Sequence, residues 1–82
     1  MAAQLVVGAD AELVAKVLGE AGDEDVLVLD GSPGRLERLQ RAVPDPRVWC
    51  LIGDAAVIPL PDASVDRVVG VEPSAEVARV TR

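Results

Sequence analysis

Short apolar segments alternate with amphipathic segments along the first 52 residues. The apolar segments at residues 5–7, 26–29 and 48–52 carry no polar residue at alternate positions, which is typical of parallel strands buried on both faces. Residues 10–21 and 33–43 instead repeat apolar side chains at helical spacing. The pattern therefore predicts a strand, a helix, a strand, a helix and a third strand.

Residues that begin and end helices flank both amphipathic segments. Asp10 can cap the first helix, and Gly22 follows it before the second strand. Ser32 is a good N-cap and Pro33 suits the first position of the second helix, which should end before Pro44. These signals support the same division into helices and strands.

The second half of the chain begins with a proline-rich segment. Residues 58–62 read IPLPD and cannot form a central strand, because proline donates no hydrogen bond to a sheet ladder. A fourth strand is predicted at residues 67–71, and a last helix from residue 75 to about residue 81. Strands that alternate with helices at this spacing predict an α/β fold with a parallel sheet and right-handed crossovers.

Length and composition indicate one domain with an aliphatic core. The chain has 82 residues, too few for two domains of ordinary size. Its apolar set is dominated by 15 Val, 12 Ala and 9 Leu, and Trp49 is the only aromatic residue. We expect Trp49 to lie in the sheet and to pack against a covering helix.

Charge and residue inventory restrict the chemistry. A net charge of −6 argues against nucleic acid or an anionic membrane as partner. The chain has one cysteine, Cys50, and no histidine, which disfavours a disulfide, covalent catalysis and a zinc site. Without a leader-like segment or an apolar run near 18 residues, a cytoplasmic protein is expected. Arg35, Arg38 and Arg41 could bind an acidic partner or form the wet face of their helix.

Four segments carry a family resemblance. Residues 53–55 read GDA and residues 58–69 read IPLPDASVDRVV, which is similar to the pattern gDa..LPfpdaSfD.V. Residues 28–36 read VLDGSPGRL, and residues 76–80 read EVARV, similar to v.gvD.Sp.ml and to the start of e.aRvLkpgG. The chain thus resembles the class I S-adenosylmethionine-dependent methyltransferases, especially the small-molecule branch that includes ubiquinone and menaquinone biosynthesis enzymes.

The resemblance implies a truncated Rossmann-like methyltransferase fold. It gives a parallel four-stranded sheet in the order 3-2-1-4 with helices on both faces, formed by one domain over residues 1–82 that lacks the C-terminal strands of the family. S-Adenosylmethionine is the implied cofactor. The resemblance places its nucleoside end near Asp30 and Gly31 after the second strand, and its adenine near Asp54 and the Ala55 backbone.

The spacing of the first two turns agrees with a nucleoside site. In such folds a carboxylate after the second strand accepts hydrogen bonds from ribose hydroxyl groups. Asp30 lies 22 residues after Gly8, close to the usual interval of about 20. A structural interpretation stands beside this one, because aspartates such as Asp30 and Asp54 commonly cap turns and a lone Gly8 commonly forms a tight turn.

The first loop departs from the family pattern, which has an acidic residue followed by Gly-x-Gly-x-Gly. When Gly8 is aligned with the first glycine, Asp10 and Glu12 occupy the other two and Val6 the acidic position. Two carboxylates would then face the carboxylate of the cofactor, and like charges at close range in a shielded cleft could cost several kcal/mol. We therefore expect S-adenosylmethionine binding to be weak or lost.

Three functions are consistent with these residues. The leading hypothesis is a non-catalytic methyltransferase-like domain that acts as a binding or assembly module. The alternative is an active methyltransferase whose site is completed by a second copy or another chain. A nicotinamide-dinucleotide module ranks last, because the chain lacks Gly-x-Gly-x-x-Gly and that function does not explain residues 58–62.

An open sheet edge predicts a homodimer. In the order 3-2-1-4 the fourth strand lies at an edge, and the β-branched segment Val68–Val71 offers unpaired ladder groups to another chain. We expect two copies to pair through this edge strand, with the C-terminal helices contacting each other through Val77 and Val80.

Overall fold

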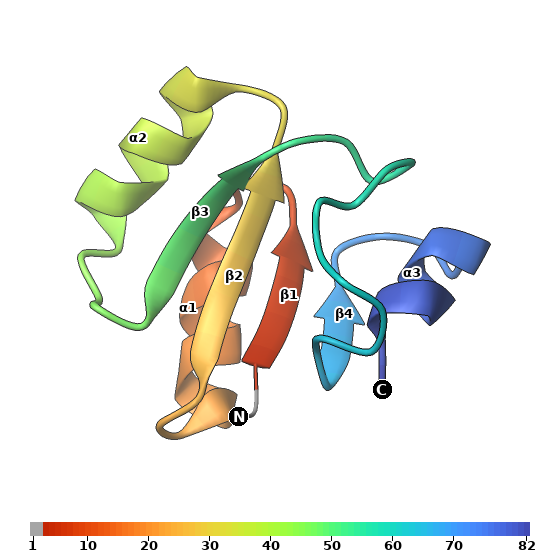
Figure 1. The fold of residues 1–82 in the computed structure, drawn as a ribbon. Helices are drawn as coiled ribbons and strands as arrows, with labels where there is room; N and C mark the ends of the chain where they lie inside the picture. Colours follow the sequence, from red (N-terminus) through yellow and green to blue (C-terminus); the bar gives the residue numbers. More distant parts are fainter. Residues whose placement is uncertain (1–2) are drawn as a thin grey trace.

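The computed structural model describes residues 3–82 (Figure 1). Its elements are β1 (Ala3–Val7), α1 (Ala11–Ala21), β2 (Asp25–Asp30), α2 (Pro33–Ala42), β3 (Val48–Ile52), β4 (Arg67–Val69) and α3 (Ala75–Val80). The four strands form one parallel sheet in the order β3-β2-β1-β4. The predicted fold class and strand order are confirmed.

The helices begin where their capping residues predict. The Asp10 carboxylate accepts backbone hydrogen bonds at the start of α1, and Gly22 follows the last residue of that helix. The Ser32 hydroxyl accepts from the backbone N–H of Arg35 at the start of α2, where Pro33 is the first helical residue. Local sequence therefore determines these boundaries.

Each face of the sheet has its own hydrophobic core, and helices cover both faces (Figure 1). On one face α1 and α2 pack against β1 and β2. On the other face α3 and the segment between β3 and β4 pack against the same strands. The buried residues of the first core are Val6, Val14, Val17, Leu18, Ala21, Val26, Val28, Leu36 and Leu39. Those of the second core are Leu5, Leu29, Ile58, Val65 and Val80.

The prediction that Trp49 packs under a helix is wrong. Its side chain is 57% exposed, and its Nε1–H donates to the Asp25 carboxylate at 3.4 Å. Trp49 lies on β3, an edge strand, and shares its face with Leu51, which packs on the second core. In Figure 1, α3 covers the β4 side of the sheet and leaves the β3 side of that face without a helix.

The fourth strand is shorter than predicted. β4 ends at Val69, and Gly70 follows with a φ of +85°. A Cβ atom built on Gly70 would lie 2.5 Å from the carbonyl oxygen of Val7, the last residue of β1. Pairing with β1 ends at Val69, and the positive φ of Gly70 interrupts the extended backbone, so Val71 does not belong to the edge strand.

Candidate functional site

The residues singled out from the sequence gather at the carboxyl edge of the sheet. Gly8 follows β1, Asp30 is the last residue of β2, and Gly31 follows it. The turn after β3 lies beside them, since Gly53 N–H donates to the Asp30 carbonyl at 3.2 Å. Parallel strands bring these three turns to one edge, where nucleoside ligands bind in sheets of this kind.

Asp30 holds the first two turns together. Its Oδ2 accepts from the Ala9 backbone N–H and its Oδ1 from the Ser32 backbone N–H, both at 2.9 Å. Those two bonds, with the Ser32 bond the larger cause and a further contribution from Arg35, hold the pKa of Asp30 below its ordinary value. The side chain is only 9% exposed. The carboxylate therefore has a structural task whether or not a ribose approaches it.

Asp10 occupies the N-terminus of α1. Its Oδ1 accepts from the backbone N–H groups of Glu12 and Leu13, at 3.0 and 3.2 Å. Such N–H groups, together with the helix dipole, attract the anionic group of a ligand. Here the protein supplies its own anion, and Glu12 adds a second negative charge in the first helical turn. These residues do not fit the carboxylate end of S-adenosylmethionine.

Asp54 is better suited to a ligand. Its Oδ1 accepts from the Ala56 backbone N–H at 2.7 Å, and its carbonyl accepts from Val57 N–H at 3.0 Å, so that residues 54–57 form a turn. The side chain is exposed, and its Oδ2 accepts no hydrogen bond from residues 3–82. Asp54 can thus cap its turn and still accept a hydrogen bond from an amine.

A hollow of about 460 Å³ adjoins this turn. Ala55 and Ala56 form one wall, and residues 71–76, which run from the end of β4 into the first turn of α3, form the other. Its volume is in the range of small-molecule sites. Sequence reasoning identified Ala55 but missed the opposite wall, although that wall follows a parallel strand and so belongs to the same edge.

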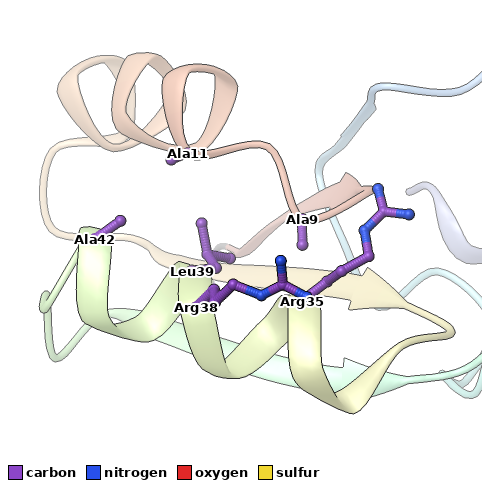
Figure 2. Close-up of a pocket in the computed structure, with 6 residues that line it drawn as sticks. All are labelled: Ala9, Ala11, Arg35, Arg38, Leu39 and Ala42. Carbon is purple, nitrogen blue, oxygen red and sulfur yellow. The ribbon is translucent and has the colours of Figure 1, made fainter.

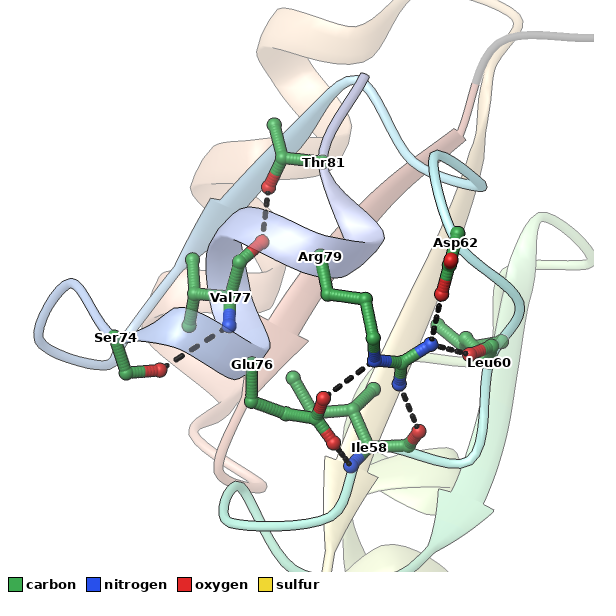
Figure 3. Close-up of polar contacts among 8 residues, drawn as sticks. All are labelled: Ile58, Leu60, Asp62, Ser74, Glu76, Val77, Arg79 and Thr81. Atoms are coloured by element: carbon green, nitrogen blue, oxygen red, sulfur yellow. Dashed lines mark hydrogen bonds and ion pairs between the residues drawn. The ribbon is translucent and has the colours of Figure 1, made fainter.

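A guanidinium clasp fixes the proline-rich segment to α3 (Figure 3). Arg79 donates to the carbonyl oxygens of Leu60 and Ile58, at 2.8 and 2.9 Å. It also donates to the carboxylates of Asp62 and Glu76. The second oxygen of Glu76 accepts from the Ile58 backbone N–H at 2.9 Å. The clasp ties the segment that follows Asp54 to the last helix.

Charge pairing strengthens the clasp. The contact with Arg79 and then the bond from Ile58 N–H lower the pKa of Glu76, while Glu76 and Asp62 raise the pKa of Arg79. Both residues come from the EVARV segment of the family resemblance, so their pattern was visible in the sequence. Their task was not visible, because it depends on residues 17 to 21 positions earlier in the chain.

No helix within residues 3–82 is long and apolar enough to cross a membrane. The same residues contain no group of three or more His, Cys, Asp or Glu side chains that could hold a metal ion.

Comparisons with known proteins concern the family and the fold of this chain. Residues 5–82 match the family model described as a methyltransferase domain. A search of curated protein sequences finds no match.

Two solved structures share the fold. One is a chain of the complex between the Haloferax volcanii Trm112 methyltransferase activator and a protein described as a methyltransferase, with 23% identity and a TM-score of 0.80. The other, from Methanococcus maripaludis, is described as an S-adenosyl-L-methionine-dependent methyltransferase, with 21% identity and a TM-score of 0.74. The alignments cover 99% of this chain but only 41% and 43% of those chains.

Proposed function

The chain belongs to the methyltransferase domain family, because residues 5–82 match the model of that family, and we propose that it is a binding or assembly module without S-adenosylmethionine-dependent catalysis. S-Adenosylmethionine is the cofactor that the family implies. The proposal concerns what this chain's own loop does to that site.

The hydrogen bonds of Asp10 carry the proposal. A backbone that should lie open toward the amino-acid end of the cofactor is covered by the Asp10 carboxylate, which uses the N–H groups of Glu12 and Leu13. The cofactor carboxylate would meet negative charge where it needs donors. Asp54 and the hollow beside Ala55 can serve only a nucleoside end. Affinity for the whole cofactor is therefore expected to be weak or absent.

The loop can be tested by the thermal shift that S-adenosylhomocysteine produces. The variant Asp10→Gly/Glu12→Gly should gain a ligand-induced rise in melting temperature that the natural chain lacks, since a ligand at about 100 times its dissociation constant stabilises a protein by about 2.7 kcal/mol. The melting temperature is compared with and without ligand for each variant, because the substitutions themselves lower stability: glycine at the cap costs only a few tenths of a kcal/mol, and glycine within the helix costs about 1 kcal/mol.

Two control variants separate the causes. Asp10→Asn/Glu12→Gln removes the charges but keeps a capping side chain, so it should gain less than the double glycine variant. Asp23→Asn/Glu37→Gln removes two charges outside the loop and should gain nothing. Equal ligand-induced shifts in the natural chain and the double glycine variant would refute the role of the loop.

The alternative is an active methyltransferase completed by a second copy or another chain. The exposed Oδ2 of Asp54 and the hollow of about 460 Å³ favour it, because they leave room for a nucleoside. A chain of similar fold occurs in a complex with a methyltransferase activator. Binding of S-adenosylmethionine by an isolated homodimer, or only after a partner is added, would support this alternative.

We also propose that the protein forms a homodimer through the outer edge of β4. Asp66 N–H donates to Ala3 on the β1 side, so by alternation the backbone groups of Arg67 and Val69 face outward. Thr81 already pairs with Val65 beside the start of this edge, which leaves the β4 strand itself for a partner. Val80 is fully buried in its own chain, so it is not available for the helix contact suggested by the sequence.

Light scattering coupled to size-exclusion chromatography tests the dimer. A mass that is twice 8.5 kDa is expected, and a concentration-independent mass near 8.5 kDa would rule the dimer out. Val69→Pro removes an outward donor from an edge strand, where proline is tolerated, and should dissociate the dimer without unfolding the chain. A folded Val69→Pro dimer would place the interface elsewhere.

A further inference from the structure

A second hollow, of about 300 Å³, lies between α1 and α2 (Figure 2). Two arginines of α2 line it, and the other lining residues are apolar. The residues that line it are Ala9, Ala11, Arg35, Arg38, Leu39 and Ala42. None of the residues placed near the nucleoside end of the cofactor lines this hollow. It is separate from the hollow beside Ala55.

The two guanidinium groups are only partly engaged. The Nε of Arg35 lies 3.6 Å from Asp30 Oδ2, and its side chain is 61% exposed. The Nε–H of Arg38 donates to the carbonyl of Gly34 in its own helix, at 3.3 Å. Within residues 3–82, Arg38 is the one arginine without a carboxylate in ion-pair range. Its terminal nitrogens therefore keep their donor capacity for a ligand.

Among the described residues that line this hollow, only Arg35 and Arg38 carry a charge. No carboxylate is among the lining residues, although the chain has a net charge of −6. Asp30 accepts from Ala9 and Ser32 besides its contact with Arg35. The Asp10 carboxylate is held by the N–H groups at the start of α1, where Glu12 adds a second negative charge. Arg35 belongs to the first turn of α2, where the helix dipole adds positive potential. Within residues 3–82, Arg38 is thus left without a carboxylate counterion, and Arg35 has only its 3.6 Å contact with Asp30 Oδ2.

We propose that this hollow binds a small phosphomonoester. Arg35 and Arg38 stand three positions apart on one helix, so both can donate to the oxygens of a phosphate group, and guanidinium forks suit phosphate geometry. Ala9, Ala11, Leu39 and Ala42 offer an apolar surface to the organic part of the ester. The volume is at the lower limit of small-molecule sites, which restricts the ligand to a compact one.

Titration of the ¹⁵N-labelled protein with phenyl phosphate, followed by NMR, tests the proposal. Saturable shifts are expected at the backbone amides of Ala9 and Ala11 and at the Nε–H of Arg38. Inorganic phosphate serves as the second probe and should bind at least about fivefold more weakly, because it does not use the apolar wall. Equal affinity for the two probes would overturn the assignment of an ester ligand.

A matched pair of variants separates a site from general attraction to positive charge. Arg38→Gln should weaken phenyl phosphate binding at least about tenfold, the loss expected for one charge-assisted contact. Arg41→Gln removes the same charge one turn later, where the arginine pairs with Glu37, and should leave the affinity within about twofold. Equal weakening by the two variants, or no saturable shift in the natural chain, would overturn the proposal.

Discussion

Replacing Gly70 by alanine should destabilise the protein far more than the same change at Gly8. Both glycines follow a strand at the carboxyl edge of the sheet, and both have positive φ angles, +85° and +103°. They differ in their surroundings. A Cβ atom on Gly70 would lie 2.5 Å from the Val7 carbonyl oxygen, whereas a Cβ atom on Gly8 would have nothing within 4 Å.

The difference sets the expected magnitude. The left-handed conformation alone costs an alanine about 1–2 kcal/mol, and this applies to both variants. At Gly70 the new methyl group must also push β4 from β1, which weakens ladder hydrogen bonds worth about 1 kcal/mol each. We expect a loss of about 3–4 kcal/mol for Gly70→Ala and about 1–2 kcal/mol for Gly8→Ala. A domain of this size has about 4–12 kcal/mol in total.

Urea denaturation followed by far-UV circular dichroism measures both losses. Circular dichroism is the better probe because the single tryptophan is largely exposed. If Gly70→Ala and Gly8→Ala lost equal free energies of unfolding, the close approach of β4 to β1 would not be a determinant of this fold.

Three further substitutions test other parts of the structure. Arg79→Lys should lower the melting temperature, because an ammonium group cannot reach all four acceptors of the clasp, whereas Arg41→Lys on an exposed pair should leave it unchanged. Trp49→Ala should lower the free energy of unfolding in urea by less than about 1.5 kcal/mol, because Trp49 is largely exposed. Loss of a buried tryptophan would instead cost about 3–5 kcal/mol. The side chain and then the backbone N–H of Arg47 lower the pKa of Asp45 to about 2. The ionised Asp45 carboxylate therefore stabilises the folded state fully at a pH above its ordinary pKa of 3.8, and this stabilisation is lost as the pH falls toward about 2. Asp45→Asn should accordingly flatten the decline in unfolding free energy below about pH 5.

The elements of this fold could be predicted because their signals are local. The apolar quartet at residues 26–29 and the caps Asp10 and Ser32 act within a few residues. The position of Trp49 could not be predicted this way, because whether a helix covers one face of β3 depends on the whole arrangement. The end of β4 likewise depends on the contact between Gly70 and Val7, which are far apart in sequence.

The candidate site shows the same division. Parallel strands necessarily place the turns after β2 and β3 at one edge, so the positions of Asp30 and Asp54 followed from the sequence. The structural task of Asp30 did not, because its partner Ala9 lies in another turn 21 residues away. The Arg79 clasp and the wall formed by residues 71–76 also arise only when distant segments pack together.

Calorimetric titration of the purified natural chain with S-adenosylhomocysteine tests most directly whether the loop at Asp10 has closed the cofactor site. S-Adenosylmethionine is titrated in parallel under the same conditions. The predicted result is no saturable heat, or a dissociation constant weaker than about 100 μM. A dissociation constant of about 1 μM or tighter, equivalent to about −8 kcal/mol, would contradict the account.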